Sequence, residues 1–329
     1  MNRRYAIVTP CRDEADYARI TLKSITRQTV PPALWVIVDD GSTDATPQIL
    51  EEYANKFPYI RIIRRTDRGR RSVGPGVIDA FYAGYETINA NDFDYVCKLD
   101  LDLDIPERYF ETLMEKMEQN SRIGTCSGKP YFHDKRGQLI SEGCGDETSI
   151  GASKFYRMTC FQQIGGFVRQ VMWDGIDCHR CRMLGWIACS WDEPAIRFIH
   201  LRAMGSSHQG ILTGRARHGF GQYFMGTSLP YMTASAIFRM TRPPYILGGA
   251  AMWWGFFKAL IKREPRYDDV GFRRFLQRYQ WACLLRGKSA ATRRLDEQQL
   301  TRWQASNNAA LHNSISGLAN SAHSQTAVV

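Results

Sequence analysis

The chain has 329 residues, 44% hydrophobic and 12% aromatic, a composition typical of a globular protein and unlike that of a disordered or fibrous one. Its formal net charge of +10 is compatible with nucleic acid, an anionic membrane surface or an anionic substrate as a partner. The nine cysteines are scattered through apolar runs, which indicates buried thiols in a reducing compartment and not a disulfide framework.

The first part of the chain, residues 1–127, alternates strand-like and helix-like patterns. The strand-like runs are apolar throughout, as in a sheet covered by helices on both faces. Alternation of strands with helices predicts a mostly parallel α/β sheet, in which ligands bind at the carboxyl ends of the strands. We expect strands at residues 5–9, 34–39, 60–64, 95–100 and 123–127, and helices at residues 17–27, 47–57, 77–88 and 106–119.

Two polar loops follow the first two expected strands. The first reads Thr9-Pro10-Cys11-Arg12-Asp13-Glu14; it lacks Gly-x-Gly-x-x-Gly, which argues against a nicotinamide or flavin enzyme. The second reads Asp39-Asp40-Gly41-Ser42-Thr43-Asp44, and its carboxylates could accept hydrogen bonds from a nucleobase N–H or a ribose hydroxyl. The alternative for this second loop is a turn rich in Asp, Gly and Ser with capping duties alone.

A third polar loop follows the expected strand at residues 95–100 and holds Asp100, Asp102 and Asp104. Residues two apart on a strand share one face, and three like charges there need compensation. Carboxylate oxygens suit Mg²⁺ or Mn²⁺, so the spacing favours a divalent-cation site. A solvated acidic turn that caps the helix near Pro106 is the alternative, and Asp104 is the residue that fits it best.

Together these motifs resemble family 2 glycosyltransferases over residues 5 to about 200, because they occur in the order that this family has. The family has the GT-A fold, a Rossmann-like, mostly parallel sheet flanked by helices, and uses nucleotide-diphosphate sugars. The resemblance implies that Asp102, with Asp100, binds the metal and the diphosphate, and that Arg71 approaches the diphosphate. The motifs are Thr9-Pro10-x-x-Asp13-Glu14, Gln28-Thr29, Asp39 to Asp44, Arg70-Arg71 and Asp100-x-Asp102, and the residues implied around the nucleobase and ribose are Thr9, Pro10, Glu14, Asp39 and Asp40.

The general base is expected in residues 173–186, a loop that leads into a helix ending at Gly185. In related polymer synthases a Glu-Asp pair precedes an Arg by six and a Gly-Trp by eleven; Asp174 fits that register, with Trp173 in place of the Glu. Asp174 and Asp177 are three apart and could face one pocket from a first helical turn. Either could be the base, and capping of the helix N-terminus is the alternative for both.

Further candidate residues follow an expected strand at residues 195–199. His200 could be a third metal ligand, or a structural histidine. Residues 205–219 read as a loop rich in Gly and Arg that could close over a diphosphate, with Arg215 and Arg217 supplying fixed charge. The Gln-x-x-Arg-Trp motif of processive synthases is absent from the sequence, so polymerisation is unsupported.

The C-terminal region, residues 229–304, predicts helices that associate with a membrane surface. Trp253 and Trp254 lie in an apolar run with basic flanks, which suits a helix in the membrane interface; a buried core helix is the alternative. Residues 268–287 predict a second, basic amphipathic helix, and residues 305–329 a disordered tail. The sequence shows no signal peptide and no window of ~20 apolar residues, so we expect a cytoplasmic protein on the inner-membrane surface.

These observations predict a nucleotide-sugar-binding half at residues 1–127 and an acceptor-binding, catalytic half at residues 128–228. The expected reaction, by resemblance to bacterial exopolysaccharide and cell-envelope transferases, moves a sugar with inversion from a nucleotide-diphosphate sugar, most simply a UDP-sugar, to a hydroxyl. The expected acceptor is a lipid-linked or envelope polysaccharide. The alternatives are an inactive nucleotide-sugar-binding protein of the same fold and a basic nucleic-acid binder, although acidic loops without metal would repel phosphates.

Overall fold

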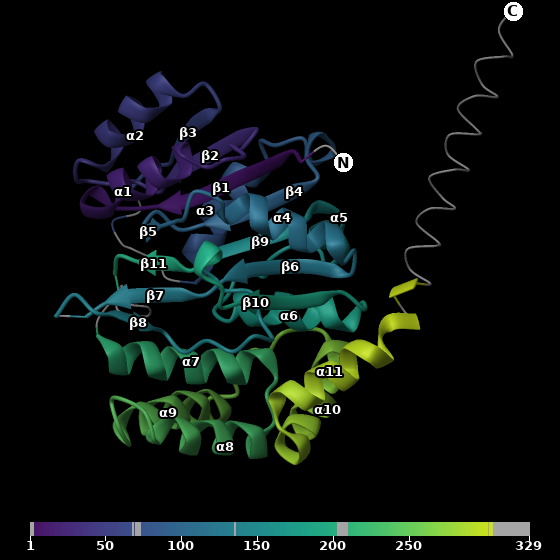
Figure 1. The fold of residues 1–329 in the computed structure, drawn as a ribbon. Helices are drawn as coiled ribbons and strands as arrows, with labels where there is room; N and C mark the ends of the chain where they lie inside the picture. The colour runs from purple at the N-terminus through teal and green to yellow at the C-terminus, as the bar shows by residue number, and fades with distance from the viewer. Residues whose placement is uncertain are drawn as a thin grey trace, which may run out of the picture.

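A central seven-stranded sheet organises the chain (Figure 1). The computed structural model describes residues 3–67, 69, 74–134, 136–202, 210–301 and 303–304. The strand order is β10-β6-β9-β4-β1-β2-β3, and β9 alone in this sheet pairs antiparallel with its neighbours. The mostly parallel sheet predicted from the sequence is therefore confirmed. Its strands are β1 (Tyr5–Cys11), β2 (Leu34–Asp39), β3 (Ile60–Arg64), β4 (Tyr95–Leu99), β6 (Ile123–Gly128), β9 (Ser153–Arg157) and β10 (Ile187–Trp191).

Helices cover both faces of this sheet, as wholly apolar strands require. Consecutive residues of a strand point to opposite faces: Ile7 packs in the cluster with α1, α2 and α4, and Val8 in the cluster with α3, α5 and α6. The four helices expected in residues 1–127 are all present, each within three residues of its expected bounds. The helices are α1 (Ala15–Thr26), α2 (Thr46–Lys56), α3 (Pro75–Tyr85), α4 (Tyr109–Gln119), α5 (Met158–Gln163) and α6 (Trp173–Met183), with short 3₁₀ turns at Ala90–Asp92 and Pro194–Ile196.

A second, four-stranded sheet lies beside the first, in the order β5-β11-β7-β8. Its strands are β5 (Leu103–Asp104), β7 (Pro130–His133), β8 (Leu139–Ser141) and β11 (Phe198–His200). The expectation that Asp104 caps the following helix is wrong, because Asp104 pairs with Ile199 in this sheet and α4 begins at Tyr109. The pairing of β5 with β11 brings His200 beside the loop that carries Asp100 and Asp102.

In the described residues, α7 (Ile211–Met225) precedes the helices of the C-terminal region, which are α8 (Leu229–Met240), α9 (Leu247–Ile261), α10 (Val270–Arg286) and α11 (Lys288–Gln298). The sequence predicted a loop up to residue 219, and this is wrong for the described part, because α7 begins at Ile211. The glycines of α7 serve packing: a Cβ at Gly219 would overlap Met252 O of α9, and one at Gly255 would overlap Ala216 O. In the described ranges no helix is both long and apolar enough to cross a bilayer.

Of the last two helices, α10 packs against α6, and α11 lies beside Arg122, the residue before β6 (Figure 1). Arg182 of α6 is almost completely buried; its guanidinium donates to Ala188 O at 2.8 Å and forms an ion pair with Asp296 of α11 at 3.6 Å. Arg122 donates to the backbone oxygen of Asp296 at 2.6 Å. The C-terminal helices are thus fastened to the α/β sheet by buried charge. The expected tail at residues 305–329 lies outside the described residues.

Candidate active site

A cavity of about 640 Å³ opens where the strands β1 and β4 end, between the sheet, α6 and α7. This is the edge at which a parallel α/β sheet binds ligands. Hereafter it is called the cleft. It is lined by the loop after β1, the loop after β4, the loop before β9, the first turn of α6 and one side of α7.

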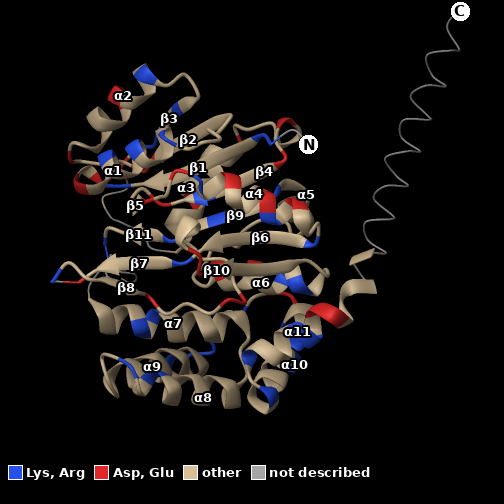
Figure 2. Ribbon diagram, in the orientation of Figure 1, with Lys and Arg blue, Asp and Glu red and all other residues tan. Residues whose placement is uncertain are grey.

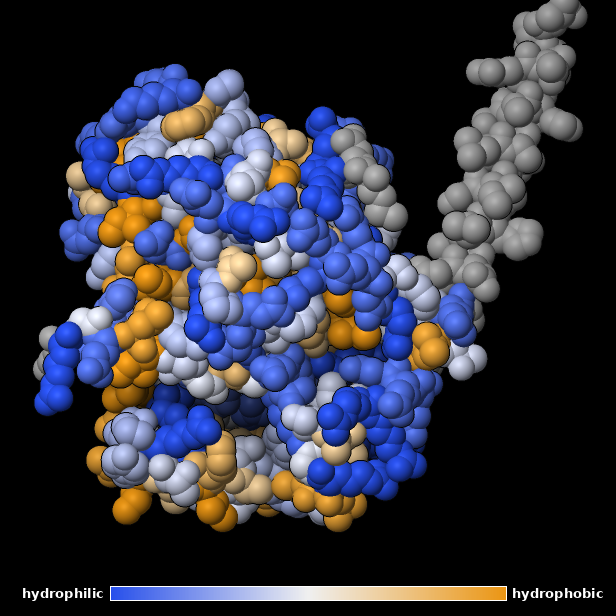
Figure 3. Space-filling view, in the orientation of Figure 1, coloured by the Kyte–Doolittle hydropathy of each residue, from blue (hydrophilic) through white to orange (hydrophobic). Residues whose placement is uncertain are grey.

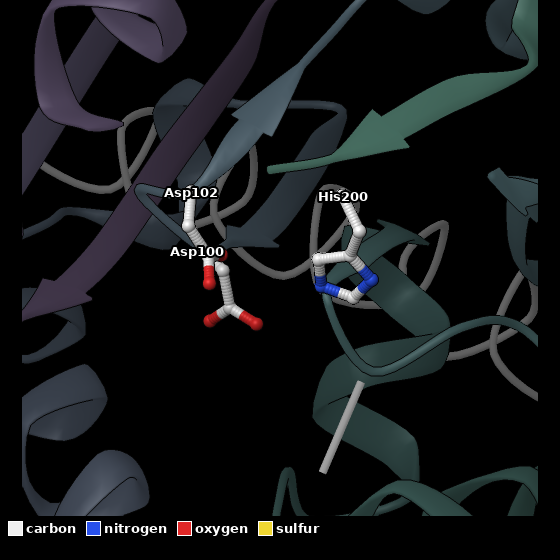
Figure 4. Close-up of side chains that lie close together, drawn as sticks. All are labelled: Asp100, Asp102 and His200. Carbon is white, nitrogen blue, oxygen red and sulfur yellow. The ribbon is translucent and has the colours of Figure 1, made fainter. Parts of the chain in front are cut away.

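Three metal-ligating side chains meet in the cleft (Figure 4). One ligand atom from each of Asp100, Asp102 and His200 lies within 4.8 Å of the others. The two carboxylates follow β4 and the imidazole ends β11, so pairing of β5 with β11 assembles the set. Two carboxylates and one imidazole fit a divalent cation, and the carboxylates in particular suit Mg²⁺ or Mn²⁺.

Cationic side chains balance these carboxylates. Arg202 donates to Asp102 at 2.8 Å and to Glu14 at 2.9 Å. Burial raises the pKa of Asp102 and the neighbouring Asp100 adds to this, while His200 and Arg202 act in the opposite direction. Burial lowers the pKa of His200, but Glu142, whose carboxylate lies 3.2 Å from Nδ1, and the two aspartates outweigh it and leave the pKa raised.

The residues expected around the nucleobase divide into two groups. Pro10, Glu14 and Asp40 line the cleft. Thr9 and Asp39 do not, contrary to expectation: Thr9 Oγ1 accepts from the indole of Trp35 inside the sheet at 2.9 Å, and Asp39 Oδ1 accepts from the Ser42 amide at 2.8 Å. Their side chains hold the strand end and the loop, and Arg71 lies outside the described residues.

The two candidate bases also separate. Asp174 lines the cleft next to Gly151. A Cβ added at Gly151 would lie 2.9 Å from Oδ2 of Asp174. Asp177 is 1% exposed and accepts from Lys154 and Tyr156. The expectation that both aspartates face the cleft is therefore wrong for Asp177, because its carboxylate pairs with Lys154 and Tyr156 of β9.

Arg215 and Arg217 line the cleft from α7. Burial lowers the pKa of Arg215, and the nearby Arg239 adds to this. Arg215 Nε is buried without a hydrogen-bond partner in the described part of the chain. An unpaired buried N–H beside a fixed positive charge is suited to an anionic ligand.

The comparisons with known proteins agree with this geometry. A family model described as Glycosyl transferase family 2 matches residues 6–167. The match covers just under half of the chain. The match holds the loops after β1, β2 and β4, and so the family 2 resemblance of the sequence is confirmed.

Two curated relatives are bacterial. The chain is 24% identical over 132 residues, 40% of its own length and 36% of the relative's, to the uncharacterized glycosyltransferase YibD of Escherichia coli (strain K12). It is 25% identical over 125 residues to the poly-beta-1,6-N-acetyl-D-glucosamine synthase of Staphylococcus epidermidis, over 38% of the chain and 28% of the relative. The matched stretch thus spans about a third of each relative.

Among solved structures, the crystal structure of GalNAc-T7 with UDP, GalNAc and Mn²⁺ superposes with a TM-score of 0.53 at 14% identity. The likeness covers 79% of this chain and 56% of that one. At such identity it concerns the fold alone. The GT-A fold expected from the family 2 motifs is confirmed.

Two residues of the cleft were not predicted from the sequence. Lys98 is 2% exposed on β4, and its ammonium donates to Asp100 and, at 2.9 Å, to Gly151 O. Its signal was a lysine inside an apolar strand, where an unpaired charge is too costly. Arg202 follows His200 by two residues, and its contact with Glu14, far away in the sequence, could not be predicted from local spacing.

Proposed function

We propose that this family 2 chain is an inverting glycosyltransferase that moves a sugar from a nucleotide-diphosphate sugar, first of all a UDP-sugar, to a hydroxyl. One observation carries the proposal: the two carboxylates and the imidazole of the metal-ligating set line the same cleft as the carboxylate of Asp174 on α6. That arrangement offers a place for a leaving diphosphate and a base for the incoming hydroxyl. GalNAc-T7, solved with UDP and Mn²⁺, makes UDP-sugars and Mn²⁺ the first ligands to test.

On the donor side, Asp40 and Glu14 are placed to hold the nucleobase and ribose, next to Pro10. Asp100, Asp102 and His200 would hold Mg²⁺ or Mn²⁺. The bound cation would stabilise the negative charge that develops on the leaving diphosphate. Arg215 and Arg217 on α7 face the same cleft and add fixed positive charge for the phosphates.

On the acceptor side, Asp174 is the base. The acceptor hydroxyl must lose a proton as its oxygen bonds to the anomeric carbon on one face of the sugar, while the bond from that carbon to the nucleoside diphosphate breaks on the opposite face. Burial raises the pKa of Asp174, whereas Lys154 and Lys98 lower it and Asp177 raises it further. The pKa of Asp174 is raised on balance, which favours proton uptake by its carboxylate. General-base catalysis typically accelerates a reaction by ~10²–10⁴-fold.

The acceptor we propose is a lipid-linked or envelope polysaccharide, reached at the cytoplasmic surface of the inner membrane. Residues 229–304 would form the membrane-associating part, beside a donor half at residues 1–127 and an acceptor half at residues 128–228. Orange side chains gather along the lower edge of the molecule over α8 and α9 (Figure 3). This α8–α9 surface consists of exposed Ile237, Phe238, Tyr245, Ile246, Leu247, Trp254 and Ile261.

Basic residues surround the α8–α9 surface (Figure 2). Arg242, Lys258, Lys262 and Arg263 are all exposed next to it. Aromatic and aliphatic side chains with a basic rim suit the interface of an anionic membrane, where each Lys or Arg contributes about 1 kcal/mol. The packing of α9 on α7 would then place the cleft close to the lipid surface.

A screen of UDP-, GDP- and dTDP-sugars for release of the nucleoside diphosphate, with Mn²⁺ or Mg²⁺, tests the proposed reaction. We expect one donor to be turned over only with metal. Asp174→Asn should lower the rate of sugar transfer by about 10²–10⁴-fold and leave nucleotide binding in place. Asp268→Asn, an exposed aspartate of the α9–α10 connection, is the control. Unchanged transfer by Asp174→Asn would remove the base assignment.

A further inference from the structure

A buried ion pair lies beneath the first turn of α6. Lys154 of β9 and Asp177 of α6 are paired with both side chains 0% exposed. Lys154 Nζ also donates to the backbone oxygen of Asp174 at 2.8 Å. Tyr156, two residues along β9 and so on the same face, donates its hydroxyl to Asp177. Neither member of the pair lines the cleft, yet the lysine touches the residue that does.

Burial of this pair is not explained by stability. Taking two charges out of water is expensive, and well-packed apolar residues can often replace a buried pair at no loss. Opposite Lys154 in the register of β4 and β9 lies Lys98, a second buried lysine. Both ammonium groups lie over the Trp173 ring, at 5.1 Å for Lys98 and 5.8 Å for Lys154. Two cations and one anion therefore surround the N-terminus of α6.

We propose that the buried pair of Lys154 and Asp177 positions Asp174 and sets how readily its carboxylate takes up a proton. The pair consists of positioning residues that act through Asp174, and the inference rests on the proposed role of Asp174 as base. The hydrogen bond from Lys154 ties the backbone of Asp174 to β9. Asp177 in turn holds Lys154 in place, together with the Tyr156 hydroxyl.

The charges that reach Asp174 come from every side. Lys154 of β9, Lys98 of β4 and Asp177 of α6 all influence the pKa of Asp174. The charge of Asp174 in turn influences the pKa of the Cys144 thiol, in the loop before β9. Burial raises the pKa of Asp174; Lys154 lowers it and Asp177 raises it. Removal of either partner breaks the same pair, but the two removals should change the proton affinity of Asp174 in opposite directions.

Titration of the full chain, labelled with ¹³C at the aspartate carboxyl carbons, tests the inference without any substrate. Asp174 is identified by the signal that is lost in Asp174→Asn. We expect its midpoint to fall by about one pH unit in Asp177→Asn, where Lys154 is left unopposed, and to rise by a similar amount in Lys154→Met. The double variant Lys154→Met/Asp177→Asn carries neither charge, keeps an oxygen for Tyr156, and should titrate near the wild type.

The order of midpoints decides the matter. Asp177→Asn must titrate below both the wild type and the double variant, and equal midpoints or a common direction of shift in all variants would overturn the inference. If the pair only stabilised the fold, both single variants would lose stability, and the midpoint of Asp174 would not move in opposite directions. The acidic limb of the transfer rate should follow the same order. If the wild type transferred no sugar while the midpoints shifted as expected, the proposed function would be wrong. The inference that the buried pair sets the proton affinity of Asp174 would still hold.

Discussion

At the scale of single residues, the cleft depends on which of three aspartates binds the cation. Asp100 and Asp102 lie with His200, whereas Asp104 pairs with Ile199 in the second sheet. We expect Asp102→Asn to weaken Mn²⁺ binding by about 100-fold, because loss of a ligand should cost at least as much as loss of its support. Free Mn²⁺ measured by electron paramagnetic resonance gives the affinity.

Asp104→Asn is the matched control for that measurement, because it removes the same charge two residues away. It should bind Mn²⁺ like the wild type. Equal weakening in both variants would mean that the acidic loop attracts the cation only through its overall charge, and the three-ligand site would then be wrong.

The sequence predicted the residues whose signal is local. Asp100 and Asp102 were found from a period of two and from their motif, and Gly185 as the residue after α6, where its φ of 91° is the left-handed value expected there. Spacing left the choice between Asp174 and Asp177 open, because it gives the face of a helix but not which side chains reach the cleft. The contact of Lys98 with Gly151 could not be predicted, since Gly151 lies in a distant loop.

At the scale of elements, α7 shows why glycine misled the sequence analysis. Glycine commonly breaks helices, so a segment rich in Gly reads as a loop. In the structure, the glycines of α7 and α9 permit two helices to approach until backbone meets backbone. This packing role of glycine is visible only in the tertiary contact, because the sequence around residue 219 does not indicate which helix packs against it.

The contact between α7 and α9 predicts a stability difference within one helix. Gly255→Ala should destabilise the protein by about 2–3 kcal/mol, because its Cβ would overlap Ala216 O and the helices must separate. Gly248→Ala, on the same helix, meets nothing closer than 3.4 Å and is the control. Urea unfolding curves measure both free energies. A Gly255→Ala variant as stable as Gly248→Ala would show that the helices are not in such close contact.

At the scale of the whole molecule, the α8–α9 surface presents exposed apolar residues along one outer edge (Figure 3). We expect the protein to sediment with vesicles that contain phosphatidylglycerol and to remain free with phosphatidylcholine alone, since the basic rim needs anionic lipid. Phe238→Ser/Trp254→Ser should lower the vesicle affinity by about 10-fold or more, because both aromatic side chains are 58–59% exposed on the α8–α9 surface.

The β7–β8 hairpin supplies a control for that experiment. Leu139 and Ile140 are also exposed, at 48% and 39%, but belong to β8 of the four-stranded sheet and not to α8 or α9. Leu139→Ser/Ile140→Ser should bind vesicles like the wild type. If the two double variants behave alike, or if binding does not weaken with salt, the proposed membrane contact must be given up.

The antiparallel strand β9 ties the two proposed halves into one folding unit. It comes from the proposed acceptor half, yet it lies between β4 and β6 of the proposed donor half. A chain cut after residue 127 would leave β4 and β6 with unpaired backbone edges where β9 now lies. Other chains can add as extra strands to such edges. The donor and acceptor halves that we propose would therefore share one sheet, and we expect a fragment of residues 1–127 to aggregate through the strand edges that β9 covers in the whole chain.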